Sequence, residues 1–192
     1  MARLPIKPRG RRTLLLIAAV GLAPIVASYA AYYALTPGKR VNYGELLATA
    51  LAPIVVGADT DGKAFSLTEL RGKWVLLIAN RAGCADACAR ALYATRQART
   101  IQGREQDRVV RLLLQPPAAP RLTPELAAAH PGLIVAKVDE HELGRLPLGS
   151  GAVAAILLLD PRGNLVLRYD ADPDIRGLAN DLQRVLNASQ IG

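Results

Sequence analysis

An uncharged apolar run near the start of the sequence constrains this chain more than any other feature. Thr13 to Pro37 contains no charged residue, and the core of the run reads TLLLIAAVGLAPIVASYAAYYAL. A helix needs about 20 apolar residues to cross the hydrocarbon core of a bilayer. A membrane helix also tolerates a proline such as Pro24, at the cost of a kink. We therefore predict a single transmembrane anchor over residues 13–36.

The charges on either side of the run predict its orientation. Residues 1–12 form a basic tail without an acidic residue, whereas only Lys39 and Arg40 closely follow the run. Because basic residues stay on the cytoplasmic side of a membrane, we predict a cytoplasmic tail and an exported remainder. This is the topology of a single-pass protein of the bacterial inner membrane with a periplasmic domain. The basic residues of the tail are Arg3, Lys7, Arg9, Arg11 and Arg12.

A cleaved signal peptide is the alternative interpretation of the same segment. Ser28-Tyr29-Ala30 has the small-x-small pattern of a cleavage site. The uncharged run is longer than the apolar region of an ordinary signal peptide, which favours an uncleaved anchor. Either interpretation exports the rest of the chain to an oxidising compartment, where two cysteines can pair.

Composition excludes several classes of protein. The chain has 192 residues, of which 51% are hydrophobic, enough for a packed core. Five of the 24 basic residues lie in the tail, which leaves 19 basic against 16 acidic residues beyond it. Since aromatic residues make up only 4% and interleave with no arginine stripe, we expect no nucleic-acid partner. Two cysteines and two histidines at unsuitable spacings also exclude a zinc finger.

The pattern of the exported part predicts an α/β fold. Residues 37–53 are predicted to be a juxtamembrane linker with one short helical turn, and residues 54–192 one domain. Apolar runs at 74–79 and 109–115 predict buried strands, joined by a helix over 84–102. Such strand–helix–strand units favour a parallel sheet with a right-handed crossover.

Further elements complete the predicted sheet. A hairpin turning at residues 59–62 is predicted before the first buried strand, and Thr123 is predicted to be the N-cap of a short helix. Another short strand is predicted over 133–138. A late hairpin turns at Pro161-Arg162-Gly163, before a final amphipathic helix over 174–186. This order predicts a thioredoxin-like mixed sheet flanked by helices.

Cys84 and Cys88 carry the chemistry of greatest interest. They follow the first buried strand and lie at the predicted start of the next helix, where backbone amides stabilise a thiolate. Arg81 and Arg90 would strengthen this effect, and Asp86 would oppose it. If the helix has already begun, the i, i+4 spacing places both sulfurs on one face. Three roles stay open on this evidence: a structural disulfide, a thiol–disulfide redox pair, and a Cu(I) site with two thiolate ligands.

The sequence resembles the Sco/SenC family, whose members are membrane-anchored thioredoxin-like proteins that help to deliver copper to cytochrome c oxidase. The family motif is CxxxC, often with a central acidic residue, as Asp86 is here. The resemblance covers about residues 54 to 188. It rests on the stretches Phe65–Leu67, Leu70–Leu77, Cys84–Cys88, Thr123–Leu126 and Leu159–Gly163.

The resemblance implies that Cys84 and Cys88 bind Cu(I). It also implies a partner in the copper-site subunit of cytochrome c oxidase, or in another copper or thiol protein. This chain is a divergent member, because Ala89 replaces the family's proline and residues 149–153 lack its copper-ligand histidine. His141, which follows the strand over 133–138, is the remaining candidate for a third ligand.

Three functions therefore remain for the exported domain. It is an accessory protein of respiratory oxidase assembly that holds Cu(I) or keeps copper-site thiols reduced, a periplasmic thiol–disulfide oxidoreductase, or a thioredoxin-like binding protein without chemistry. In the redox role, Cys84 attacks and Cys88 resolves. His130, which precedes Pro131 at a predicted helix end, is expected on the surface.

Overall fold

The computed structural model describes residues 8–34 and 42–189. The chain divides into two units, one ending at Val41 and the other beginning at Asn42. Residues 1–7 of the predicted tail lie outside the described residues, as do residues 35–36 of the predicted anchor and 37–41 of the predicted linker.

The first unit contains one long helix, α1 (Pro8–Ala34). Its stretch from Gly10 to Ala31 has a mean hydropathy of 2.2, and none of it is buried. It is long and apolar enough to cross a membrane, and it includes Pro24 as predicted. The helix begins earlier than the predicted start at Thr13 and takes in part of the basic tail. Proline is favoured in the first turn of a helix, because its missing N–H has no intrahelical partner there.

The second unit is built on a mixed sheet with the strand order β1-β8-β7-β4-β5-β6-β2-β3. The three central strands β4, β5 and β6 are parallel, and β7, β8 and β2 are antiparallel to their neighbours. The strands are β1 (Glu45–Leu51), β2 (Val56–Asp59), β3 (Ala64–Ser66), β4 (Trp74–Asn80), β5 (Val109–Gln115), β6 (Leu133–Val138), β7 (Ala154–Leu159) and β8 (Asn164–Asp170).

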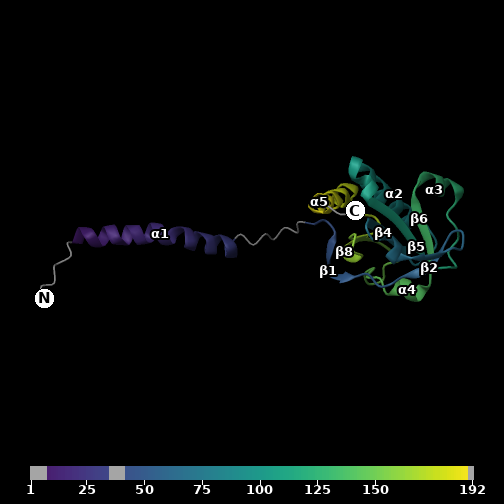
Figure 1. Ribbon diagram of the computed structural model, residues 1–192, viewed down its shortest axis with the longest axis horizontal. Helices are drawn as coiled ribbons and strands as arrows, with labels where there is room; N and C mark the ends of the chain where they lie inside the picture. The colour runs from purple at the N-terminus through teal and green to yellow at the C-terminus, as the bar shows by residue number, and fades with distance from the viewer. Residues whose placement is uncertain (1–7, 35–41, 190–192) are drawn as a thin grey trace. The chain divides into compact units, whose positions relative to one another are not determined.

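Helices lie on both faces of this sheet (Figure 1). Alternate residues of β4 point to opposite faces, so that Leu76 packs under α2 and α5 while Leu77 packs near α4. Both leucines are fully buried, as expected for a central strand. The helices are α2 (Asp86–Ile101), α3 (Pro124–Ala129), α4 (Glu140–Gly144) and α5 (Ile175–Ala188), with 3-10 turns at Leu67–Leu70 and Gly103–Arg108. The predicted mixed sheet flanked by helices is confirmed.

The segment before the domain core differs from the prediction. The short helical turn expected within residues 37–53 is wrong, because Glu45–Leu51 forms strand β1 along the edge of β8. Glu45 lies opposite Arg168 in this ladder, and the two side chains form an ion pair. The local sequence ELLATAL has helical composition, but the unpaired backbone of β8 supplies hydrogen bonds that favour a strand.

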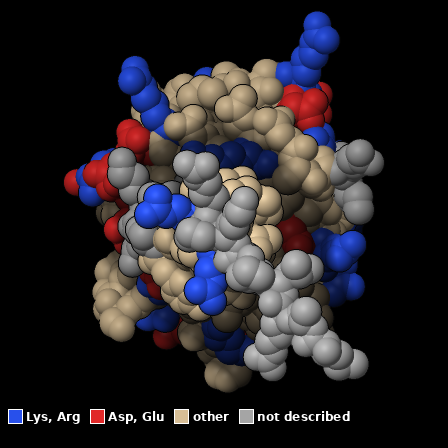
Figure 2. All heavy atoms as spheres, turned by 90° about the vertical axis from the view of Figure 1, so that its left-hand side faces the viewer, with Lys and Arg blue, Asp and Glu red and all other residues tan. Residues whose placement is uncertain are grey.

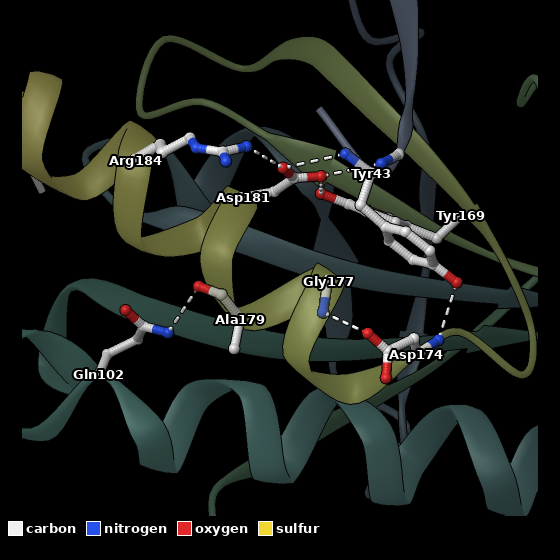
Figure 3. A network of polar contacts seen from close by, with 9 residues as sticks. Tyr43, Gln102, Tyr169, Asp174, Gly177, Ala179, Asp181 and Arg184 are labelled. Carbon is white, nitrogen blue, oxygen red and sulfur yellow. Dashed lines mark hydrogen bonds and ion pairs between the residues drawn. The ribbon is translucent and has the colours of Figure 1, made fainter. Parts of the chain in front are cut away.

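A buried carboxylate joins the start of this unit to its last helix (Figure 3). Asp181 on α5 accepts hydrogen bonds from the backbone N–H groups of Tyr43 (3.1 Å) and Gly44 (2.8 Å). It also accepts from the Tyr169 hydroxyl at 3.3 Å and forms an ion pair with Arg184 at 3.1 Å. Burial and the nearby Asp181 carboxylate raise the pKa of Tyr169. The phenol therefore stays protonated and donates to Asp181.

Candidate functional site

The two cysteines form a disulfide at the amino-terminal end of α2. Helix α2 begins at Asp86, so Cys84 lies in the turn before the helix and Cys88 in its first turn. Their Cα atoms are 4.9 Å apart. The i, i+4 argument required both cysteines to lie in the helix, and Cys84 lies outside it. The turn before α2 brings Cys84 to Cys88 instead.

The two cysteine residues differ in exposure. Cys88 is only 2% exposed and belongs to the core beneath α2, whereas Cys84 is partly exposed at the edge of that core. In thiol–disulfide exchange, the reacting sulfur must be accessible to the sulfur of the partner protein. Cys84 is therefore the cysteine that is more open to an external thiol.

The start of α2 lacks a side-chain cap. Ala85 occupies the N-cap position and contributes no capping hydrogen bond. The amides of the first turn therefore remain available to stabilise a thiolate, which is the effect predicted for this position. Arg90, expected to add to it, is instead paired with Asp172 at 3.0 Å.

The segment just before Cys84 contacts two other loops. The backbone N–H of Arg81 donates to the carbonyl of Val153 at 2.8 Å, which joins the end of β4 to the loop before β7. Pro120, from the loop after β5, lies so close to Gly83 that a Cβ there would be 3.1 Å from its ring. Val153 is 55% exposed. Sequence reasoning did not predict that Pro120 meets Gly83 or that the Val153 carbonyl meets Arg81, because no local pattern marks contacts between separate loops.

Arg81 also borders an open cavity of about 350 Å³. Arg81 lines it together with Glu140, Leu143 and Gly144 of α4. His141 also lies on α4, but its side chain is 84% exposed and its ionic neighbour is Glu142. Within residues 8–34 and 42–189, no three His, Cys, Asp or Glu side chains are grouped to hold a metal ion. The structure therefore does not bring His141 to the cysteine pair as a third ligand.

His130 does not lie on the surface, contrary to the sequence-based expectation. It is only 6% exposed, and its Nδ1 lies 3.4 Å from the guanidinium of Arg111, which is itself 3% exposed. Burial and the charge of Arg111 lower the pKa of His130. Packing of the α3–β6 connection against β5 buries this helix end, and no local sequence signal reports that packing.

Charged side chains are mixed on the face of the molecule that Figure 2 shows. Basic and acidic groups occur there at several separate positions, with uncharged surface between them.

Two family models match the chain. The model for the thioredoxin-like, C-terminal domain of transmembrane-like proteins matches residues 74–189, and the model for their N-terminal domain matches residues 5–34. A search of curated proteins finds no match.

Solved structures share the thioredoxin-like fold of the second unit. Copper-bound ScoI from Bradyrhizobium japonicum is 21% identical, with a TM-score of 0.53 over 70% of this chain and 99% of its own. Apo Sco1 from Thermus thermophilus is 22% identical, with a TM-score of 0.59 over 77% of this chain and 99% of its own. The thioredoxin domain of a thiol-disulfide oxidoreductase from Bacteroides vulgatus is 20% identical, with a TM-score of 0.55 over 73% and 99%. At these identities the similarity shows the fold.

Proposed function

Because the chain belongs to the family of transmembrane-like proteins with a thioredoxin-like C-terminal domain, we propose that it is a membrane-tethered, Sco-like thiol–disulfide exchange protein. The observation that carries this proposal is the disulfide between a reachable Cys84 and a buried Cys88 at the uncapped start of α2. A disulfide at this point joins residues only four apart. Since so small a loop removes little entropy from the unfolded chain, redox work explains the bond better than stabilisation does.

The reaction starts from the reduced pair. The Cys84 thiolate attacks the disulfide of a client protein and forms a mixed disulfide, and the first client sulfur leaves and takes up a proton. The Cys88 thiolate then attacks the Cys84 sulfur and releases the second client sulfur, which also takes up a proton. Two electrons pass to the client, which leaves as a dithiol, and this chain ends with the Cys84–Cys88 disulfide that the structure contains.

We place the client in the assembly of a respiratory oxidase, where copper-site thiols must be reduced before they bind metal. Two features support this choice: the CxxxC spacing with Asp86 at its centre, and the structural similarity to Sco proteins. The basic residues before the apolar helix favour a cytoplasmic amino terminus. In this proposal α1 is an uncleaved anchor in a bacterial inner membrane, and the domain faces the periplasm.

Copper holding is the second candidate function, with the metal as cargo. Two thiolates suit Cu(I), so the reduced pair supplies two suitable ligands. The described residues offer no third grouped ligand. A thiolate of the receiving protein would therefore complete the coordination during transfer.

A trapping experiment tests the exchange function. The Cys88→Ser variant of the full chain, held in detergent and mixed with an oxidised copper-site domain of an oxidase, should accumulate a mixed disulfide through Cys84. The Cys84→Ser variant is the matched control and should trap far less, because Cys88 is buried. Equal trapping by both variants, or no trapping by either, would overturn the proposal.

An anaerobic Cu(I) titration of the reduced full chain against a competing chelator separates the two candidates. One tightly held copper ion, lost in Cys84→Ser and in Cys88→Ser, favours copper holding. Binding that survives in either variant, or that never competes with the chelator, leaves thiol–disulfide exchange as the function.

A further inference from the structure

The edge strand β1 carries apolar side chains that the domain leaves uncovered. Leu46 and Leu51 are 65% and 63% exposed, and no charged residue occurs between Leu46 and Ala58. The one charged residue of β1 is Glu45, which is paired with Arg168. Edge strands ordinarily carry charges or lie under another element, because an exposed uncharged edge promotes association. We therefore expect something outside the domain to cover β1.

Both leucines lie on the face of the sheet that α5 covers. Leu46 is opposite Leu167, which packs in the core beneath α5. Leu51 is opposite Asn164, and the next residue, Leu165, packs in the core on the other face. Residues opposite each other in a ladder share a face, and successive residues alternate between faces. The two exposed leucines therefore belong to one side of β1.

Tyr43 adds an aromatic ring to the same side. It lies against Gly177 of α5, where an added Cβ would be 2.5 Å from the ring, and it is 51% exposed. A tyrosine beside exposed leucines is typical of protein surfaces at a membrane–water interface, because the ring is apolar and its hydroxyl is polar. We refer to Tyr43, Leu46 and Leu51 as the β1 surface.

Only a short piece of chain separates this surface from α1. The helix ends at Ala34, and the described part of the domain begins at Asn42, eight residues later. Since an extended chain spans at most about 3.6 Å per residue, the two Cα atoms are at most about 29 Å apart. Asp181 holds the backbone N–H groups of Tyr43 and Gly44, so release of this end of the domain would break two hydrogen bonds. A membrane that α1 spans is therefore within reach of the β1 surface.

We propose that the β1 surface lies against the lipid bilayer that α1 spans, at the level where headgroups meet acyl chains. This inference goes beyond the proposed function and rests on it only for the anchoring role of α1. A second copy of the chain is a poorer cover, because the register of β1 against β8 shifts between Leu46 and Ala50. Such an irregularity disrupts the edge that backbone pairing with another strand requires. Contact with lipid needs only the side chains.

Spin labels on the two edge strands of the sheet test the contact. Both cysteines of the chain are held in the disulfide, so an added cysteine gives a single labelling site. Ala48→Cys places the label on β1, and Ala64→Cys places a matched label on β3 at the opposite edge; both alanines are exposed.

The labelled full chain is placed at one copy per nanodisc of phosphatidylcholine and phosphatidylglycerol. Electron paramagnetic resonance then measures how strongly oxygen and a water-soluble nickel chelate relax each label. We expect the label at position 48 to lie within about 5–10 Å of the headgroup–acyl boundary and to be protected from nickel. The label at position 64 should be open to nickel. Equal nickel access at the two positions would overturn the proposal.

Variants of the exposed apolar residues separate side-chain contact from proximity alone. Leu46→Gln combined with Leu51→Gln should expose the label at position 48 to nickel, because both apolar contacts with lipid are lost. Val56→Gln removes an exposed valine from β2, near the opposite edge, and should leave that label protected. Exposure of the label by both changes, or by neither, would contradict the β1 surface as the contact.

A label on α1 distinguishes failure of this inference from failure of the proposed function. Gly21→Cys lies within α1, where an added side chain meets no atom within 4 Å, and its label should be reached by oxygen but not by nickel. Nickel access there would remove the anchor on which both proposals depend. Protection at position 21 without protection at position 48 would overturn only the lipid contact. Protection at position 48 that requires two copies per nanodisc, with dipolar broadening between their labels, would identify a second copy as the cover and overturn it too.

Discussion

The side chain of Asp181 accepts a hydrogen bond from the backbone N–H of Gly44 at 2.8 Å, across 137 positions of sequence. This contact fixes the first described residues of the domain to its last helix. The Tyr43 hydroxyl strengthens the junction by accepting from the backbone N–H of Asp174, the N-cap residue of α5. Tyr43 and Gly44, which follow the boundary between the two units, are thus held by specific polar contacts (Figure 3).

Removing this carboxylate should destabilise the domain. Asp181→Ala leaves the N–H groups of Tyr43 and Gly44 and the Tyr169 hydroxyl without their acceptor. We expect a loss of about 2–4 kcal/mol in the free energy of unfolding, because each buried donor left unpaired is costly. Urea denaturation measures the change. Asp170→Ala, at the exposed end of β8, is the control and should change stability by less than about 0.5 kcal/mol.

Two helical glycines should respond in opposite ways to alanine. A Cβ on Gly177 of α5 would lie 2.5 Å from the ring of Tyr43, whereas a Cβ on Gly144 of α4 meets no atom within 4 Å. Gly144→Ala should therefore gain up to about 1 kcal/mol from helix propensity, and Gly177→Ala should lose stability by displacing Tyr43. In a Tyr43→Ala background, Gly177→Ala should become stabilising. Thermal unfolding of the native chain, the two single variants at Gly177 and Tyr43, and the double variant measures the coupling between these two positions. Strictly additive changes in stability would contradict the prediction.

The stability of the domain should fall as the solution becomes acidic, in part through His130. Its pKa in the folded state lies below the ordinary value of 6.5. The unfolded chain therefore binds more protons than the folded chain as the pH drops through 6.5 toward the lowered pKa, and stability is lost over that window. His130→Asn keeps an acceptor near Arg111 but cannot titrate, so its stability should depend less on pH between 7 and 5. His141→Asn, on an exposed side chain, should behave like the native chain when both are unfolded by urea in phosphate-free buffer.

The two cysteines should differ in reactivity once reduced. In Cys88→Ser the remaining Cys84 is partly exposed, whereas in Cys84→Ser the remaining Cys88 is 2% exposed. We expect iodoacetamide to modify Cys84 at least about tenfold faster, because alkylation needs an accessible thiolate. Mass spectrometry of quenched samples gives both rates. The two variants should react alike in 8 M urea, and equal rates in the folded state would contradict the exposure of Cys84.

Much of the fold could be predicted from residue patterns. The continuous apolar runs predict β4 and β5 almost to the residue, and the N-cap role of Thr123 is confirmed by its hydrogen bond from Leu126. Strand β1 could not be predicted, because the neighbouring edge of β8 decides its conformation. The contacts of the segment before Cys84 could not be predicted either, because Pro120 meets Gly83 and the Val153 carbonyl meets Arg81 only when separate loops come together.

The sequence by itself determined the long apolar helix near its start, the mixed sheet and the place of the cysteine pair at a strand-to-helix junction. These features depend on hydrophobic runs and local spacing, which act over a few residues. Only the tertiary structure decided that Cys88 is buried while Cys84 is reachable, that His141 points to solvent, and that His130 lies against Arg111. Burial and the pairing of charges depend on segments that meet after folding, and no local pattern carries that information.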